Sequence, residues 1–427
     1  MKRAVRIRCE FKMGGQETFH TPITMVNTNS QLQAACDRLS THPSIAVDTE
    51  FLSSFTYYPK LCLVQIASED EAIIIDPLES GLDLDPLKQL MINQSVLKVF
   101  YAYEQDFRVF HSIWKVIPSP AFDTRIAGML CGLDANGYTT MVKQLLGHQI
   151  KNNQQRSRWE RRPLSREQIE YAADDVRYLI GVYKKLRQQL NINGREGWCL
   201  EEMETMKDLD TFVRDPEVAW KQFHSSGKDK RQLAILFEIA KLRTECAQRL
   251  NRPLPWIMSD RLVKVVAVKR PQNEKDLKKL LFRRERYQHS IGPEILEAVK
   301  RGLQKNLDDL PEVKKEPRSA KSAAFQLLSA LLDINSRSVS ISREVIASND
   351  DLKVLAGAKK PEQLDVAVMR GWRRRVFGND ALGLLEGKMA ITVRSGRGRK
   401  IPTDKPERID LKTSLGQPEV PLMLATP

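Results

Sequence analysis

The sequence predicts an α/β domain, with a mixed sheet flanked by helices, followed by two small all-α domains. Apolar runs of strand type alternate with helical patterns in the first half of the chain. From residue 206 on, the apolar residues recur only with helical spacing, in two groups separated by the Pro- and charge-rich segment 309–321. Strands interleaved with helices are typical of an α/β fold, and several short helices in succession are typical of a small bundle.

Four strands are expected in the α/β domain. A polar turn at Ser68–Glu71 joins two of them into a hairpin, so the sheet is expected to start with antiparallel strands. The apolar runs that predict the strands are 45–48, 61–67, 72–76 and 97–100. Helical spacing predicts helices over residues 32–39, 84–92, 104–114, 123–130, 138–146 and 165–190.

These patterns divide the chain into six segments. They are an N-terminal extension (1–24), the α/β domain (25–205), a helical domain with a leading helix (206–308), a linker (309–321), a second helical domain (322–392) and a basic tail (393–427). The extension is either an extra strand or a loose basic arm. The tail is rich in Gly, Pro and charge but poor in apolar residues, so we expect it to be disordered.

Charge points to a polyanionic partner. The 427 residues carry a formal charge of +14, and residues 228–305 alone hold 20 Lys and Arg against 9 Asp and Glu. A local basic excess of this kind is typical of a nucleic-acid interface, although a merely soluble basic surface is the alternative.

Several other classes of protein are excluded. No apolar run approaches the ~20 residues that span a bilayer, and no apolar segment of a secretory signal follows the basic N-terminus. The six cysteines lack CxxC spacing, which argues against a zinc site or a disulfide framework and suits a cytoplasmic protein. There is no GxxxxGK[ST] motif of an NTP-driven motor and no GxSxG motif of a serine hydrolase.

An acidic pair follows the first predicted strand, in the order Val47-Asp48-Thr49-Glu50. Side chains alternate along a strand, so Asp48 and Glu50 share a face and Thr49 points to the other. Two carboxylates on one face repel each other unless a cation lies between them. Taken alone, the pair is better explained as the solvated end of a strand.

Two later positions complete this pair. Asp106 lies in the first turn of the helix that follows the fourth strand, where an acid also simply suits the helix dipole. Tyr171 and Asp175 are four residues apart in a later helix, so they share one helical face.

Together, Asp48, Glu50, Asp106 and Asp175 offer hard oxygen ligands of the kind that Mg²⁺ and Mn²⁺ prefer. Two such ions can activate water for phosphodiester cleavage, and the phenol of Tyr171 can position that water by a hydrogen bond.

A resemblance to a known family rests on four segments of the chain. They are DTEF at Asp48–Phe51, YYPKLCLVQIA at Tyr57–Ala67, FDTRIAG at Phe122–Gly128 and RPLSREQIEYAADDVRYL at Arg162–Leu179. In this order they resemble the DEDD exonucleases with a tyrosine in the third motif, and among these the bacterial ribonuclease D family. The resemblance spans residues 25–190. It implies a ribonuclease H-like fold and 3′→5′ removal of nucleoside 5′-monophosphates with two divalent metal ions, Mg²⁺ or Mn²⁺.

Carried over by position, the resemblance assigns the metal ligands to Asp48, Glu50, Asp106 and Asp175, and implies a catalytic role for Tyr171 together with Glu50. Asp174, beside Asp175, leaves some ambiguity, which the spacing from Tyr171 resolves in favour of Asp175. The segment from about 228 to 305 resembles the HRDC module of the same enzymes, a likeness carried by residues 229–260. The segment ending at 371–378 resembles their second helical domain.

The chain departs from that family's pattern at two places. Relatives often have a histidine shortly before the second-motif aspartate, where this chain has Val99–Ala102, and an acid before the tryptophan at which this chain has Arg158-Trp159. Neither departure touches the four acids, so we expect them to affect the handling of substrate more than the binding of metal.

Nucleic-acid contacts are expected from aromatic and basic side chains. Phe51 is predicted either to stack on a terminal base or to pack in the core. Trp159 lies among several arginines, which suits either a phosphate backbone or an ordinary solvated loop. The cations of the HRDC-like segment that we expect to contact phosphates are Lys264, Arg270, Lys278 and Arg283.

The function expected from these features is metal-dependent 3′→5′ exoribonuclease activity in the cytoplasm. The family resemblance suggests RNA with a free 3′ end, such as tRNA precursors, as the substrate. Two rival hypotheses remain at this stage: a single-stranded DNA exonuclease with the same chemistry, and a non-catalytic RNA-binding protein that has kept the fold. Only contacts to the 2′-OH distinguish RNA from DNA.

Overall fold

The structure, a computed structural model, describes residues 21–133, 137–150, 154–208, 215–226, 229–281, 290–308, 310, 322–394 and 405–410. This part of the chain divides into two compact units. The first covers residues 21–127 and 137–191, and the second covers residues 128–133 and those from 192 onward. The sequence placed the end of the α/β domain at residue 205, and the bounds of the individual domains stay a prediction.

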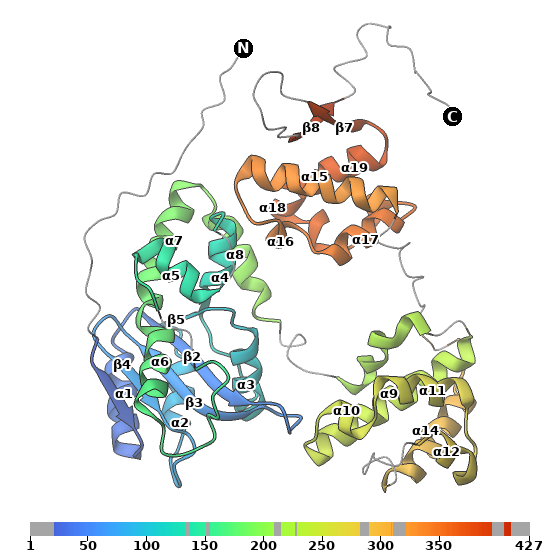
Figure 1. Cartoon of the computed structure of the whole chain (residues 1–427), viewed down its shortest axis with the longest axis horizontal. Coiled ribbons are helices and arrows are strands. Elements are labelled where there is room, and N and C mark those ends of the chain that lie inside the picture. Colours follow the sequence, from blue (N-terminus) through green and yellow to red (C-terminus); the bar gives the residue numbers. More distant parts are fainter. Residues whose placement is uncertain are drawn as a thin grey trace, which may run out of the picture. The chain divides into compact units, whose positions relative to one another are not determined.

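A six-stranded mixed sheet forms the centre of the first unit, in the order β1-β4-β3-β2-β5-β6. Strands β2 to β5 are labelled in Figure 1. The pairs β2/β3 and β3/β4 are antiparallel, and the pairs β1/β4, β2/β5 and β5/β6 are parallel. The strands are β1 (Ile23–Val26), β2 (Ser44–Leu52), β3 (Lys60–Ala67), β4 (Ala72–Ile75), β5 (Leu97–Phe100) and β6 (Ala121–Asp123).

The four predicted strands are confirmed as β2 to β5, and the expected hairpin is β3/β4. The structure adds β1 and β6, which have only four and three residues. β6, with three residues, is too short to display the alternation by which a strand is recognised, and β1 is no longer than β4 or β5, so length does not explain why it was missed. β1 begins inside the predicted extension 1–24, and residues 1–20 of that extension lie outside the described part of the chain.

The helices of the first unit lie close to the predicted bounds. The predicted helix over 165–190 is in fact two helices that meet at Tyr178. The full set is α1 (Asn29–Leu39), α2 (Asp85–Ile92), α3 (Glu104–Trp114), α4 (Thr124–Leu130), α5 (Tyr138–Leu146), α6 (Arg166–Arg177) and α7 (Leu179–Ile192). α4 crosses the boundary into the second unit at residue 128.

α6 covers β3, β4 and β2 (Figure 1). β3, which lies inside the sheet, is buried along its whole length except at Lys60. A capping box starts α6: the Gln168 backbone N–H donates to Ser165 Oγ at 3.2 Å, and the Ser165 N–H donates to Gln168 Oε1 at 2.9 Å. The sequence S-x-x-Q therefore sets where α6 begins, and with it which side chains face the sheet.

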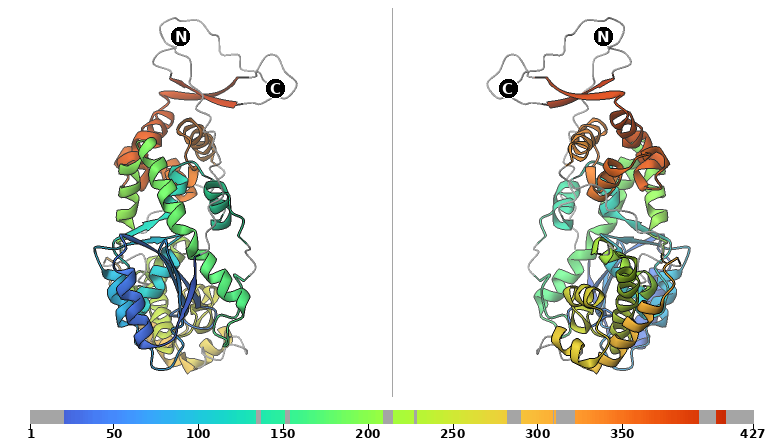
Figure 2. Two further views of the ribbon diagram at one scale, coloured as in Figure 1. Left: turned by 90° about the vertical axis from the view of Figure 1, so that its left-hand side faces the viewer. Right: turned by 90° about the vertical axis from the view of Figure 1, so that its right-hand side faces the viewer.

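The second unit contains two helical groups, drawn in yellow and in orange to red in Figure 2. The first group corresponds to the predicted helical domain and has α9 at its centre, packed against α11 and α14. Its elements are the 3₁₀ helix η2 (Pro216–Ser226), α9 (Lys230–Leu250), α10 (Leu254–Ile257), α11 (Asp260–Lys269), α12 (Glu274–Leu280) and α14 (Gly292–Gln304).

The second helical group contains a short π-helix, η5, between two α-helices. Its elements are α15 (Ala323–Val339), α16 (Arg343–Ile346), α17 (Asn349–Gly357), the 3₁₀ helices η3 (Pro361–Gln363) and η4 (Ala367–Met369), α18 (Gly371–Arg373), η5 (Arg374–Gly378) and α19 (Asn379–Leu385).

α8 (Glu196–Thr205) joins this second group through one buried acid. Glu202 is 5% exposed and accepts hydrogen bonds from Trp372 Nε1 at 2.8 Å and from the Arg373 guanidinium at 2.5 and 2.6 Å. Trp198, on the same helix, stacks on Trp372 with ring centroids 4.9 Å apart. Gly371, with φ 48°, lies so close to the Glu201 carboxylate that a side chain at this position would clash with it.

The predicted disorder of the tail from residue 393 is wrong for residues 405–410. This segment forms β8 (Lys405–Asp410), which pairs antiparallel with β7 (Met389–Arg394). β7 contains three consecutive β-branched residues, Ile391-Thr392-Val393, and such a strand offers an edge to any partner segment. The pairing depends on that partner rather than on the local composition of residues 405–410.

We expect Glu202→Ala to lower the free energy of unfolding of the second unit by about 3–5 kcal/mol, because a buried guanidinium and an indole N–H would lose their acceptor. Urea denaturation measures this effect. Glu204→Ala is the matched control, since Glu204 is an exposed residue of the same helix, and its effect should stay within about 0.5 kcal/mol. Equal destabilisation by both variants would contradict the assigned role of Glu202.

Candidate active site

The candidate site lies where β2 leaves the core. Ile45, Ala46 and Val47 are completely buried, and the acids follow directly after them. In the pairing with β3, Asp48 lies opposite Gln65 and Glu50 opposite Leu63, and the register shifts between Glu50 and Phe51. The strand therefore presents both carboxylates on one face just before it becomes irregular.

Asp48, Glu50 and Asp175 form a cluster in which three carboxylate oxygens, one from each residue, lie within 4.8 Å of one another. Asp175 comes from α6, which covers this face of the sheet. Asp174 is not a member of the cluster: its carboxylate accepts from the Arg177 guanidinium at 3.0 Å. The structure therefore places Asp175 beside Asp48 and Glu50, and its role as a metal ligand stays a prediction.

Asp106, the fourth predicted acid, lies in the first turn of α3 and contacts β2 at Thr49, the residue between Asp48 and Glu50. It is 5% exposed, and its Oδ1 accepts a hydrogen bond from the Thr49 hydroxyl at 2.5 Å. The start of α3 is fixed by Asp123, which accepts the backbone N–H of Tyr103 at 2.8 Å. Asp106 lies outside the three-residue cluster, yet its charge acts on Glu50 and Asp175.

Burial is the main cause of the electrostatic character of the site. Loss of hydration raises the pKa of Asp48 to about 7. Loss of hydration, followed by the charges of Asp48, Asp175 and Asp106, raises the pKa of Glu50 to about 10. Burial together with the Asp48 charge also holds the pKa values of Asp106 and Asp175 well above the ordinary range of a carboxylic acid. A cation among these groups would favour their charged forms.

Tyr171 is buried and hydrogen-bonded to Asp175, one turn further along α6. Burial, followed by the charge of Asp175, raises the pKa of the phenol, so it stays protonated at neutral pH and remains able to donate a hydrogen bond. The ring of Trp159 lies 5.9 Å from the Tyr171 ring, between centroids. Tyr171 is therefore held between an acid of the cluster and an indole.

Trp159 is only 4% exposed, so its position gives no support to the predicted contact with nucleic acid. Arg162 fixes the loop that carries it. The Arg162 guanidinium pairs with the buried Asp76 and donates to the carbonyls of Cys62 at 2.8 Å and Trp159 at 2.7 Å. Of the arginines around Trp159, Arg162 thus acts inside the fold, whereas Arg156, Arg158 and Arg161 are exposed.

Two residues near the site were missed by the sequence reasoning. Tyr138 donates from its hydroxyl to the Asp174 carbonyl at 3.2 Å, and no spacing in the sequence marked it. Gln65 lies opposite Asp48 in the sheet. A polar residue in the middle of the apolar run 61–67 was the signal that could have identified Gln65.

The other predicted nucleic-acid residues belong to both units of the chain. Phe51 is half-buried in β2. In the first helical group of the second unit, Lys264 is exposed and lies 6.0 Å from the centre of the Phe223 ring. Arg270 pairs with Asp229, and Lys278 pairs with Glu274 at 3.0 Å. Arg283 lies outside the described residues.

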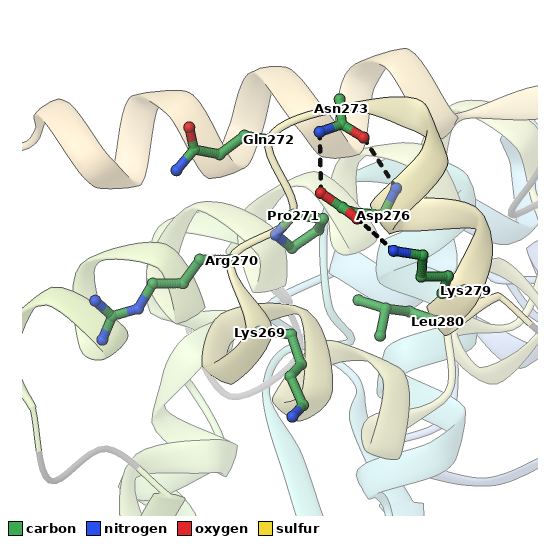
Figure 3. Close-up of a pocket in the computed structure, with 8 residues that line it drawn as sticks. All are labelled: Lys269, Arg270, Pro271, Gln272, Asn273, Asp276, Lys279 and Leu280. Atoms are coloured by element: carbon green, nitrogen blue, oxygen red, sulfur yellow. Dashed lines mark hydrogen bonds and ion pairs between the residues drawn. The ribbon is translucent and has the colours of Figure 1, made fainter.

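A pocket of about 380 Å³ opens beside Arg270, between α11 and α12 (Figure 3). Three cations and one acid line it, but Lys279 turns to Asp276, with a distance of 2.8 Å. The lining residues are Lys269, Arg270, Pro271, Gln272, Asn273, Asp276, Lys279 and Leu280. The lining is therefore basic, but Arg270 and Lys279 are each paired with an acid.

Comparison with known families gives two matches. Residues 23–191 match a family described as 3′-5′ exonuclease, and residues 232–299 match the HRDC domain. The helical group with α9 at its centre is therefore an HRDC domain, as predicted. No helix in the described ranges is long and apolar enough to cross a membrane.

Curated relatives cover most of the chain. Ribonuclease D of Nitrobacter hamburgensis is 37% identical over 376 residues, which are 87% of this chain and 98% of the relative. Ribonuclease D of Sphingobium indicum is 36% identical, over 87% of this chain and 97% of the relative. The crystal structure of Escherichia coli RNase D, described as an exoribonuclease involved in structured RNA processing, superposes with a TM-score of 0.76 at 27% identity, and covers 86% of this chain and 99% of its own.

We expect Asp48→Asn to raise the melting temperature of the metal-free protein at pH 8. The pKa of Asp48 in the folded protein is about 7, which lies above that of an ordinary aspartate. The folded protein therefore loses stability as pH rises through 7 and Asp48 loses its proton. Asparagine stays neutral, so the variant avoids this loss. Each kcal/mol recovered corresponds to roughly 2–4 °C.

Calorimetry in the presence of a chelator measures this difference, which should shrink at pH 5. Asp37→Asn is the control, because Asp37 is an exposed residue of α1 and its substitution should leave the melting temperature unchanged at both pH values. A lower melting temperature for Asp48→Asn than for the unmodified chain at pH 8 would rule out the electrostatic cause.

Proposed function

Because the chain belongs to the ribonuclease D family and is a 3′→5′ exoribonuclease, we propose that it works by a two-metal mechanism and trims the 3′ ends of structured RNA precursors, tRNA precursors among them. The observation that carries the mechanism is the cluster of Asp48, Glu50 and Asp175. The membership of the family and the RNA-processing role described for the Escherichia coli enzyme support the class of substrate.

The cluster fits divalent ions such as Mg²⁺ and Mn²⁺. Its donors are all carboxylate oxygens, which these ions prefer, and three of them can approach a common centre. Their partial burial reduces the hydration of the negative charges, so a bound cation would relieve a repulsion that the fold itself creates. We assign Asp106 as the fourth ligand, because it is buried beside the same strand end.

Two bound ions would supply an activated water and stabilise the leaving oxygen during phosphodiester hydrolysis. The protonated phenol of Tyr171 would donate a hydrogen bond to that water and aim it at the terminal phosphorus, with Glu50 as the second residue in contact with it. The water oxygen forms the new bond to phosphorus, the bond to the 3′ oxygen of the preceding nucleotide breaks, and that oxygen takes up a proton. The products are a nucleoside 5′-monophosphate and an RNA shortened by one nucleotide.

The HRDC domain is proposed to hold the RNA through phosphates, without choice of sequence. Its support is the basic excess of residues 228–305 and the basic pocket beside Arg270. Lys264 is the best-placed candidate, because it is exposed and is in no ion pair with a described acid. The five cysteines in the described part of the chain are free thiols, which suits action in the reducing cytoplasm.

We expect Asp48→Asn combined with Asp175→Asn to reduce the trimming of a labelled RNA in Mg²⁺ by at least about a thousandfold, because metal ligation supplies several kcal/mol of transition-state stabilisation. Tyr171→Phe should reduce the rate by about 10²–10⁴-fold. Asp174→Asn is the matched control, since Asp174 is the neighbour that the cluster excludes, and it should remain close to wild type.

The same assay is run on a tRNA precursor with a short 3′ trailer and on single-stranded DNA of the same sequence as the trailer. Faster removal of nucleotides from the RNA than from the DNA supports the proposal. A rate on DNA that equals or exceeds the rate on RNA would overturn the assignment to RNA. RNA binding without any metal-dependent product would favour a non-catalytic binding protein instead.

For the HRDC domain, Lys264→Ala should weaken binding of single-stranded RNA and lower the slope of log affinity against log salt by about 1. Fluorescence anisotropy over a salt series measures both quantities. Lys300→Ala is the control, because Lys300 is an exposed cation of the same domain that pairs with Glu297 at 3.8 Å. Identical slopes for the two variants would remove Lys264 from the proposed interface.

A further inference from the structure

Gln65 is a buried amide without a hydrogen-bond partner among the residues that the structure describes. It lies in β3, between the apolar residues Val64 and Ile66, and is 0% exposed. Within this part of the chain, neither Oε1 nor Nε2 has a partner. An amide removed from water without new hydrogen bonds destabilises a protein, and most buried polar groups avoid this cost. Gln65 therefore requires an explanation that packing does not supply.

The register of the sheet shows which polar group this amide can reach. Gln65 pairs with Asp48 on β2 and with Ile74 on β4. Residues directly opposite each other on antiparallel strands point to the same face, with their Cβ atoms about 4.5–5.5 Å apart. Of the two residues directly opposite Gln65, only Asp48 is polar. The glutamine side chain is long enough for its amide to reach the Asp48 carboxylate across this distance.

Asp48 belongs to the proposed metal site and is also the cross-strand neighbour of Gln65. Its carboxylate belongs to the cluster with Glu50 and Asp175, and it accepts a hydrogen bond from the backbone N–H of Thr49. An ionised carboxylate only accepts hydrogen bonds and has about four positions at which to do so. An oxygen that binds a cation therefore leaves positions open for a neighbouring donor.

We propose that Gln65 is a positioning residue of this site, and that its Nε2 donates a hydrogen bond to the Asp48 carboxylate when this group holds a divalent cation. The inference rests on the proposed function, since it needs a cation at Asp48. A hydrogen bond to an ionised acceptor is about twice as strong as one between neutral groups, so the amide gains its partner mainly in the metal-bound state.

The difference between the metal-bound and metal-free states distinguishes a residue that positions a ligand from one that only fills the core. A partner that orients a metal ligand typically contributes 10–100-fold to metal affinity. If the amide is satisfied only with the ion bound, its removal should weaken metal binding without loss of stability in the metal-free protein. A residue that merely fills the core would behave in the opposite way, because its substitution would alter stability and leave the affinity unchanged.

The test is Gln65→Met, which keeps the length of the side chain and removes both polar atoms. Isothermal titration of Mn²⁺ into the chelator-stripped full chain, without RNA, is expected to give an affinity at least 10-fold weaker than that of the unmodified chain. The melting temperature in the presence of a chelator is expected to be equal or higher. Gln65→Leu serves as a second apolar variant and is expected to behave in the same way.

Ile66→Val is the matched control. Ile66 is the next residue of β3, fully buried on the opposite face and paired with Val47. Its substitution should lower the melting temperature slightly and leave the Mn²⁺ affinity within twofold of the unmodified chain.

Mn²⁺ affinities within twofold for Gln65→Met and the unmodified chain would overturn the role of Gln65 while leaving the proposed function intact. A weaker affinity accompanied by a melting temperature lower than that of Ile66→Val would overturn it too, because distorted packing would then explain both effects. An unmodified chain that binds no Mn²⁺ would overturn the proposed metal site itself. Loss of affinity with unimpaired metal-free stability supports the inference.

Discussion

Burial of several carboxylates at the end of one strand is the constraint on which the architecture of the first unit depends. Asp48 and Glu50 leave the core on one face of β2, and α6 adds Asp175 above them. Loss of hydration makes ionisation of these acids unfavourable, as the raised pKa values of Asp48 and Glu50 show. The clustered carboxylates therefore lower the stability of the folded protein. Positive charge among them would make their ionised forms favourable.

Other parts of the first unit hold this arrangement in place. The capping box at Ser165 sets the start of α6, and hence the positions of Tyr171 and Asp175 on its inner face. The ion pair between Arg162 and Asp76 fixes the loop of Trp159, whose ring lies against Tyr171. These interactions do not involve the clustered acids directly, and they restrict the positions of Tyr171 and Asp175.

Some cations of the chain are paired with acids of the fold, and others are exposed at the surface, where they can contact phosphates. Arg162 neutralises a buried acid, and Arg270 and Lys278 each pair with an acid of the HRDC domain. Lys264 lies at the surface, without a described acidic partner. Net charge thus indicates the type of partner correctly, but it overstates the number of cations that are available to phosphates.

Local sequence determined most of the elements and the chemistry of the site. The two-residue period placed Asp48 and Glu50 on one face, and the four-residue spacing linked Tyr171 to Asp175, because these geometries depend only on the backbone of one element. The tertiary structure decided which distant groups meet: Asp106 with Thr49, Trp159 with Tyr171, and α8 with the C-terminal helices through Glu202. It also placed Gln65 opposite Asp48. Strand register and helix packing arise from contacts between residues far apart in the chain, and no local pattern specifies them.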